Sequence, residues 1–210
     1  LKILRAAQIV LDEGICTPVL VGQEWKIINR AEQVNVDLSG VEIVEQIEDE
    51  TFEQYAQALW EDRQRKGMTL TAARQALRNR TTYGMMMVKH GAADGLLGGL
   101  ATPYADTIRP ALQVLGKDAS VSVISGVYLM LFKGRRYFFG DCTVNVSPDA
   151  ATLAQIARNT ADVARQFGDE PRVAMLSYSD FGENRGYPGV DKVSQAVSIL
   201  QATDPDLAVD

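Results

Sequence analysis

The residues best suited to chemistry lie in a glycine-rich stretch that leads to Arg109. Gly98 and Gly99 follow a short apolar run at 95–97, and a polar bend then leads into a helical pattern. A strand, a glycine turn and a helix start together predict an anion site, because unpaired backbone N–H groups and the positive end of the helix dipole meet there. Thr107 is predicted as the N-cap residue, and Arg109 adds a planar fork of donors suited to phosphate or carboxylate. The alternative is that the glycines only permit close packing and that Arg109 is solvated.

Two further polar segments, Gly140–Asn145 and Ser177–Gly189, lie at predicted strand ends. Ligands of open α/β sheets bind outside the carboxyl ends of the strands. The three polar segments therefore predict one cleft that binds a small anionic ligand, with a generic sugar-phosphate-binding lobe as a weaker interpretation. The chain has no G-x-G-x-x-G motif in the frame of a dinucleotide site and no G-x-S-x-G motif of a serine hydrolase.

The elements that must position these residues alternate between helices and strands, which is typical of a parallel α/β sheet. Helices are expected at 2–13, 24–34, 52–66, from 69 or 71 to 80, at 82–89, from Thr107 onward, from Pro148 (capped by Ser147) to 167, and at 190–201; strands are expected at 18–21, 41–44, 95–97, 121–124, 127–132, 137–139 and 172–178. The strands at 127–132 and 137–139, joined through the four residues KGRR (133–136), predict an antiparallel hairpin. A boundary near residue 120 is expected to separate a first lobe, 1–120, from a second, 121–210.

Composition limits the class of protein. The 210 residues are 46% hydrophobic and 23% charged with a net charge of −6, which argues against a general nucleic-acid or anionic-membrane surface. Cys16 and Cys142 lack metal-ligand spacing, and His90 is the single histidine, so no metal site is expected. The longest apolar run, 127–132, is too short to span a bilayer, and a cytoplasmic protein is expected. Both ends of the sequence look cut, so a fragment of a longer protein is expected.

Three long stretches carry a resemblance to a known family. They are ADGLLGGLATPYADTIRPALQVLG (93–116), FGDCTVNVSPDAATLAQIARNTADVARQFGDEPRVAMLSYS (139–179) and PGVDKVSQAVSILQATDPDLAVD (188–210). They resemble the phosphate acetyl/butyryltransferase family. Within this family, the chain resembles the C-terminal module of bacterial hybrid NADP-dependent malic enzymes more than a free-standing phosphotransacetylase. The residues that carry this resemblance are ARQALRNRTTYGMMMVKHGAADG (73–95), Tyr104 and the segment 179–182.

The resemblance implies a three-layer α/β/α fold in two lobes, with a mostly parallel sheet and an antiparallel hairpin, similar to isocitrate and isopropylmalate dehydrogenases. It also implies a set of residues that bind acetyl-CoA or phosphate: Arg109, Thr107, Asp106, Arg80, Asp141, Asn145 and Ser179. For Asp141 and Asn145, the alternative is that they only form the turn at the strand end.

The malic-enzyme resemblance implies a regulatory module that senses acetyl-CoA and supports homo-oligomerisation, with no cofactor or catalytic residue of its own. The parent chain would carry a malic-enzyme domain that uses NADP and a divalent metal to decarboxylate malate oxidatively to pyruvate. The alternative is a phosphate acetyltransferase that moves an acetyl group between acetyl phosphate and CoA. In the family, the segments assigned to CoA thiol activation lie beyond the position of Asp210, so this stretch alone is not expected to catalyse acyl transfer.

Overall fold

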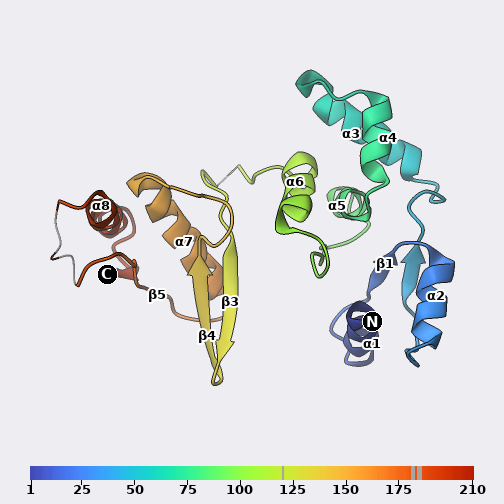
Figure 1. Ribbon diagram of the computed structural model, residues 1–210, viewed down its shortest axis with the longest axis horizontal. Helices are drawn as coiled ribbons and strands as arrows, with labels where there is room; N and C mark the ends of the chain where they lie inside the picture. Colours follow the sequence, from blue (N-terminus) through green and yellow to red (C-terminus); the bar gives the residue numbers. More distant parts are fainter. Residues whose placement is uncertain (120, 181–182, 184–185) are drawn as a thin grey trace. The chain divides into compact units, whose positions relative to one another are not determined.

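The computed structural model describes residues 1–119, 121–180, 183 and 186–210, which form two compact units, Leu1–Gly116 and Lys117–Asp210 (Figure 1). Each unit combines helices with two-stranded sheets. The α/β class that the sequence predicts is therefore confirmed. Among the described residues, no helix is long and apolar enough to cross a membrane.

The first unit contains six helices, a 3-10 helix and a parallel pair of strands in its described part. The elements are α1 (Lys2–Asp12), β1 (Val19–Val21), α2 (Glu24–Glu32), β2 (Glu42–Val44), α3 (Phe52–Arg63), η1 (Gln64–Lys66), α4 (Leu70–Leu77), α5 (Arg80–Lys89) and α6 (Tyr104–Val114). The strands pair with Val19 opposite Glu42 and Val21 opposite Val44. This pair confirms the strands that the sequence predicts at 18–21 and 41–44.

The core of the first unit lies between α3, α4 and α5. Leu59, Leu77 and Met86 are fully buried there, together with the ring of Tyr83. The neighbouring methionines of α5 are buried too, as expected for an apolar run at helical spacing. The helix α5 is thus held on its buried side, which leaves its first residue, Arg80, at the surface.

The helix that carries Arg109 begins earlier than predicted. Residues 92–103 are irregular, and α6 starts at Tyr104 after Pro103, so Thr107 is not the N-cap and Arg109 is the sixth helical residue. Pro103 is extended (ψ 143°) and its carbonyl accepts the first hydrogen bond, from the N–H of Asp106 at 2.9 Å. Pro110 therefore lies within the helix rather than in its first turn, where it cannot donate to the Asp106 carbonyl.

Two of the predicted strands are irregular. The segment at 95–97 continues the irregular stretch before α6, and Leu97 is fully exposed. At 121–124 the backbone carbonyls of Val123 and Ile124 accept hydrogen bonds from side-chain amides instead of a neighbouring strand. An apolar run becomes a strand only where a second strand lies beside it, and neither run has such a neighbour in the described structure.

The second unit places an antiparallel hairpin and a short parallel pair around two helices. Its elements are β3 (Val127–Phe132), β4 (Arg135–Gly140), α7 (Ala150–Gln166), β5 (Arg172–Val173), α8 (Pro188–Thr203) and β6 (Ala208–Val209). Small residues on α7, including Ala157 and Ala161, pack against Leu200 of α8. Asp149, not Ser147, caps α7, because its Oδ1 accepts the Thr152 N–H at 2.8 Å.

The predicted hairpin is present, and a two-residue turn joins its strands. Lys133 (φ 49°) and Gly134 (φ 76°) both adopt left-handed conformations, as a two-residue turn between twisted strands requires. The strand predicted at 172–178 is shorter: Arg172–Val173 pairs with β6, and the last hydrogen bond of the pairing runs from the Met175 N–H to the Asp210 carbonyl at 2.7 Å. Leu176 and Tyr178 are each 88% exposed, so the fully buried strand expected there is wrong.

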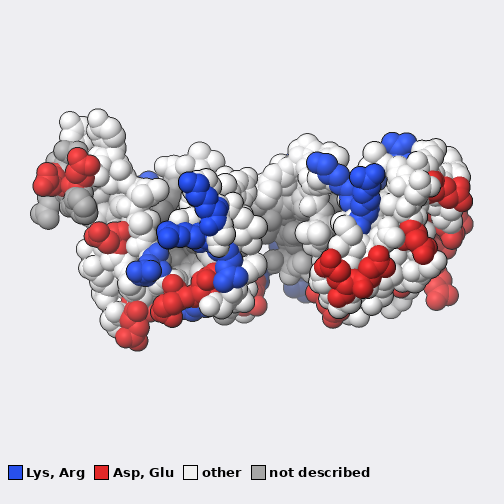
Figure 2. Space-filling model, turned by 90° about the horizontal axis from the view of Figure 1, so that it is seen from below, with Lys and Arg blue, Asp and Glu red and all other residues white. Residues whose placement is uncertain are grey.

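Charge is mixed over the surface of both units. Figure 2 shows groups of Lys and Arg next to groups of Asp and Glu on the face that it displays. The described residues include ion pairs such as Arg74 with Glu53 and Arg136 with Asp169. The displayed face offers no continuous basic surface, in keeping with the net charge of −6.

Candidate functional site

Arg109 lies on the exposed side of α6. Its side chain is 67% exposed, and its Nη1 is 4.0 Å from Oδ1 of Asp106, one turn earlier in the helix. An ion pair this long and this exposed holds the guanidinium weakly. Most of its five N–H donors therefore face solvent, where they are available to an anion.

The side chain of Thr107 points away from that of Arg109, toward Gly99 in the glycine turn. Its Oγ1 is buried and has no hydrogen-bond partner within the described part of the chain. A side-chain carbon on Gly99 (φ 98°) would lie 3.8 Å from that oxygen. A buried hydroxyl without a partner costs free energy, so this oxygen marks a point where a polar ligand atom would be stabilising.

Arg80, the first residue of α5, lies at the carboxyl end of β1. A side-chain carbon on Gly22, directly after β1, would lie 3.7 Å from both Nε and Nη1 of Arg80. Beside it, the carboxylate of Glu45 accepts the N–H of Glu24 at 3.1 Å, at the start of α2. The helix terminus there is thus already used by an acidic group of the same chain, whereas the guanidinium of Arg80 is exposed.

Asp141, in contrast, has both carboxylate oxygens occupied. Oδ1 accepts the N–H groups of Gly126 (2.9 Å), Thr143 (2.9 Å) and Val144 (3.1 Å), and Oδ2 accepts the N–H and the Nδ2–H of Asn145 (both 2.6 Å). Burial alone would raise the pKa of Asp141, but these hydrogen bonds lower it from 3.8 to about 2. The geometry favours the turn-forming alternative for this residue.

Asn145 and Asn159 complete the turn. Nδ2 of Asn145 also donates to the Ile124 carbonyl at 2.9 Å, and Nδ2 of Asn159, on α7, donates to the Val123 carbonyl at 2.8 Å. The sequence analysis missed Asn159, although a polar residue facing inward from the apolar side of a predicted helix is a usable signal.

Gly126 is a second residue that the sequence analysis missed. An added Cβ would lie 2.0 Å from Oγ1 of Thr143, so a side chain here would force Thr143 to move. A glycine directly before a predicted strand is the signal that could have found it.

Ser179 lies in the irregular stretch after β5 and is half-buried. Part of the segment predicted as a polar cluster around it, residues 181–182 and 184–185, lies outside the described residues. The predicted cluster therefore contributes only Ser179 and its described neighbours to the site. The chain places Arg80, Asp106, Thr107 and Arg109 in the first unit and Asp141, Asn145 and Ser179 in the second.

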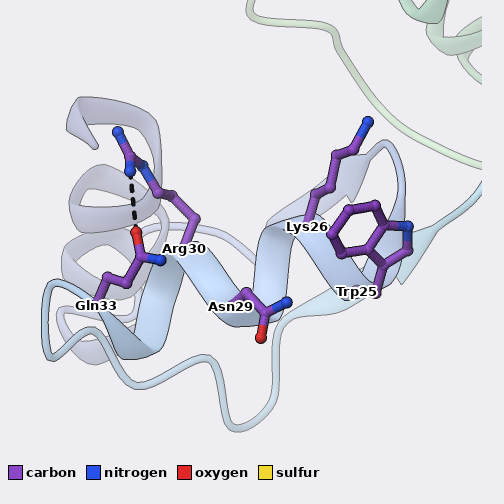
Figure 3. Close-up of a pocket in the computed structure, with 5 residues that line it drawn as sticks. All are labelled: Trp25, Lys26, Asn29, Arg30 and Gln33. Atoms are coloured by element: carbon purple, nitrogen blue, oxygen red, sulfur yellow. Dashed lines mark hydrogen bonds between the residues drawn. The ribbon is translucent and has the colours of Figure 1, made fainter.

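The structure also has a shallow depression of about 650 Å³ on α2, lined by Trp25, Lys26, Asn29, Arg30 and Gln33 (Figure 3). Four of the five side chains come from α2, and Gln33, which accepts a hydrogen bond from Arg30 at 2.9 Å, directly follows it. None of them belongs to the predicted site. A depression on a single helix encloses little of a ligand, since ligand pockets are usually concave and surrounded by several elements.

No group of three or more His, Cys, Asp or Glu side chains in the described stretches is arranged to hold a metal ion. His90 stacks beside Tyr55, with the ring centroids 5.0 Å apart. Both cysteines are free thiols, and Sγ of Cys142 donates to the Phe139 carbonyl at 3.1 Å. The chemistry available from the predicted site is therefore anion binding through arginine, hydroxyl and backbone donors.

The chain matches the family described as phosphate acetyl/butaryl transferase over residues 1–210. It is 38% identical over 209 residues to the phosphate acetyltransferase of Corynebacterium glutamicum, covering 100% of this chain and 63% of that protein. It is 40% identical over 210 residues to the phosphate acetyltransferase of Escherichia coli, covering 100% of this chain and 29% of that protein. The chain thus spans less than two thirds of the length of these relatives.

The chain is also similar to solved structures of phosphotransacetylases. The structure is similar to a phosphotransacetylase from Streptococcus pyogenes, with a TM-score of 0.88, 38% identity, and coverage of 99% of this chain and 63% of that chain. The EutD phosphotransacetylase from Staphylococcus aureus gives a TM-score of 0.86 at 35% identity, with the same coverage. Both structures confirm the α/β fold; likeness to isocitrate and isopropylmalate dehydrogenases is not supported by these matches.

These similarities overturn the malic-enzyme interpretation. The relatives are phosphate acetyltransferases, so the expected regulatory module, its malic-enzyme partner domain, and the NADP and oxidoreductase assignments are wrong or unsupported. The resemblance at 73–95 and at Tyr104 was too local to separate two branches of one family. The match over residues 1–210 is independent of that distinction, and the chain belongs to the phosphate acetyl/butyryltransferase family.

Proposed function

We propose that this chain forms the substrate-binding part of a phosphate acetyltransferase, which transfers an acetyl group between acetyl phosphate and CoA. The observation that carries the proposal is 38–40% identity to phosphate acetyltransferases along the whole chain. In the reaction, the CoA thiolate attacks the acetyl carbon, the C–S bond forms, and the C–O bond to phosphate breaks. Inorganic phosphate leaves with the electron pair of that bond.

In this proposal the arginines bind the anionic groups. The exposed guanidiniums of Arg109 and Arg80 donate to phosphate oxygens of acetyl phosphate or CoA, and the buried hydroxyl of Thr107 donates to the same ligand. Asp106 holds Arg109 through its long ion pair. Ser179 of the second unit is proposed as a further ligand-binding residue. Donors already in place stabilise the oxyanion that develops on the acetyl group during attack.

Asp141 and Asn145 have an indirect role within the second unit. Their side chains bind backbone groups of 124–126 and 143–145, so they shape the strand end rather than contact the ligand. For the complete domain, we propose the three-layer α/β/α architecture with lobes at 1–120 and 121–210. The support is the alternation of helices and strands along the chain. The exposed thiols of Cys16 and Cys142 support a reducing, cytoplasmic location.

The experiment is a chimera in which these 210 residues replace the matching part of the Bacillus subtilis phosphate acetyltransferase, which is 38% identical over 209 residues. The assay follows acetyl-CoA formed from acetyl phosphate and CoA. We expect turnover by the chimera and a loss of turnover in Arg109→Ala. Arg74→Ala is the matched control, because Arg74 is an exposed arginine that pairs with Glu53 in another helix.

A chimera can fail through poor assembly, so binding of CoA by the 210-residue chain is measured by calorimetry as well. If the folded chimera forms no acetyl-CoA and the chain binds neither CoA nor acetyl phosphate, the proposed function is wrong. If the chain binds CoA and Arg109→Ala binds it equally well, the activity stands but Arg109 leaves the site.

A further inference from the structure

Gly84 lies in the interior of α5, where glycine is less favourable than alanine. It is buried in a regular helix and its φ is not positive, so no turn requires it. The close approach of Leu96 does require it, because an added Cβ would lie 2.8 Å from Cδ1 of Leu96, with Cδ2 and Cγ at 3.7 and 3.8 Å. Leu96 thus occupies the space that a side chain at position 84 would take.

Leu96 belongs to the glycine-rich loop at 92–103, which joins α5 to α6 (Figure 1). The leucines of this loop differ in their packing: Leu96 is 36% exposed, whereas Leu100 is 61% exposed and Leu97 is fully exposed. The contact with Gly84 accounts for this difference. Leu96 is therefore the leucine through which the middle of the loop is attached to α5.

The contact lies on the side of α5 that carries Arg80. Residues four apart in a helix are neighbours on one face, and side chains lean toward the N-terminus of the helix. Gly84 follows Arg80, the first residue of α5, by four positions. Leu96 therefore holds the loop about one helical turn away from the exposed guanidinium of Arg80.

The same loop also lies against Thr107 of α6. Gly99 follows Leu96 by three residues, and a Cβ on Gly99 would lie 3.8 Å from Oγ1 of Thr107. Three residues span at most about 10 Å, and α5 and α6 pack against each other. A displacement of Leu96 from α5 therefore shifts the glycine turn beside the Thr107 hydroxyl, which is buried and has no hydrogen-bond partner within the described part of the chain.

We propose that Gly84 and Leu96 are positioning residues of the anion site. Leu96, packed into the space that Gly84 leaves, holds the glycine turn against Thr107 and keeps this turn next to Arg80. Both residues act through the loop, because a loop that is already in its binding conformation loses less entropy when the ligand binds. This inference rests on the proposed function, in which Arg80 and Thr107 bind CoA or acetyl phosphate.

The test compares variants of the 210-residue chain by calorimetry with CoA and with acetyl phosphate, and by urea denaturation. Gly84→Ala should displace the mobile end of Leu96, so binding should weaken about threefold to tenfold while the urea midpoint stays nearly unchanged. Leu96→Ala should weaken binding to a similar extent, because the loop loses its contact with α5. Leu97→Ala, at the fully exposed neighbour, is the matched control and should bind like the wild type.

The double variant Gly84→Ala/Leu96→Ala distinguishes positioning from a general loss of packing. The new methyl group takes up space that the leucine leaves, so the double variant should bind more tightly than either single variant. Single variants that bind like the wild type, or losses that simply multiply in the double variant, would overturn this inference and leave the proposed function intact. A wild-type chain that binds neither CoA nor acetyl phosphate would overturn both.

Discussion

Around Asp141, every oxygen of the carboxylate accepts hydrogen bonds from the same chain, whereas around Arg109 the guanidinium meets one carboxylate at 4.0 Å. Both regions follow glycines and both carry polar residues in an apolar context. The difference is in how many polar groups the fold itself satisfies. A polar group whose partners lie within the chain stabilises the fold, and one left without partners is available to a ligand.

The largest expected effect is on the Asp141 side of this comparison. Asp141→Asn should lower the free energy of unfolding by about 3 kcal/mol, because the new amide nitrogen would face N–H donors and leave them unpaired. Urea denaturation measures the change. The control is Asp162→Asn, whose carboxylate pairs with Arg165 at the surface and which should cost less than about 0.5 kcal/mol. Equal losses of unfolding free energy in the two variants would mean that the hydrogen bonds of the Asp141 turn contribute little to stability.

Acid should remove the same stabilisation in the wild-type chain. The pKa of Asp141 is lowered from 3.8 to about 2 in the folded state, so the fold favours the charged form. Its contribution is fully present above the unfolded pKa and is lost as the pH falls through the folded value. The gap in unfolding free energy between wild type and Asp141→Asn should therefore narrow as the pH is lowered from about 5 to about 2. A difference in unfolding free energy that stays constant over this pH range would contradict the lowered pKa of Asp141.

On the other side, Arg109→Ala should affect binding and leave stability nearly unchanged. Loss of a charged hydrogen bond to the ligand should weaken CoA or acetyl phosphate binding by about 1.5–3 kcal/mol, or roughly 10- to 150-fold. The exposed pair with Asp106 should contribute less than about 0.5 kcal/mol to folding. Calorimetry measures the change in ligand affinity of this variant, and urea denaturation measures the change in its stability. A large loss of stability with unchanged affinity would show that Arg109 stabilises the fold and does not bind the ligand.

Packing in the Asp141 turn gives a further test. Gly126→Ala would place a methyl group 2.0 Å from Oγ1 of Thr143 and should cost about 1–3 kcal/mol of stability. Adding Thr143→Ala removes that oxygen and should restore most of the loss. A double-mutant cycle on unfolding free energies measures the coupling. Additive effects would show that the two residues do not meet.

The smallest effect is expected at Thr107. Thr107→Val keeps the shape of the side chain and removes a buried hydroxyl that has no described partner, so stability should be unchanged or rise by up to about 1 kcal/mol. Binding of the proposed ligand should fall about threefold to tenfold, as for one neutral hydrogen bond. A loss of stability above about 1 kcal/mol would mean that the hydroxyl has a partner in the fold.

Features that depend on neighbouring residues could be predicted from the sequence. Gly14, Gly67 and Gly168 directly follow the ends predicted for the helices at 2–13, 52–66 and 148–167, and each has a positive φ, because few other residues adopt that conformation without strain. The hairpin was predicted from its link at 133–136, of which Lys133 and Gly134 form the turn. The helix that carries the buried methionine run was predicted at 82–89, and the family was predicted from long matching stretches.

Features that depend on distant residues were decided by the tertiary structure. The runs at 95–97 and 121–124 have the composition of strands, but a strand also needs a neighbour with free N–H and C=O groups. Asp141 is a residue type that commonly contacts ligands. Its carboxylate is already hydrogen-bonded within the chain, however, and Gly126, 15 residues earlier, supplies one of the N–H donors. Sequence shows which groups can form hydrogen bonds. Only the folded chain shows which of them are already used, because partners are brought together by packing rather than by order along the chain.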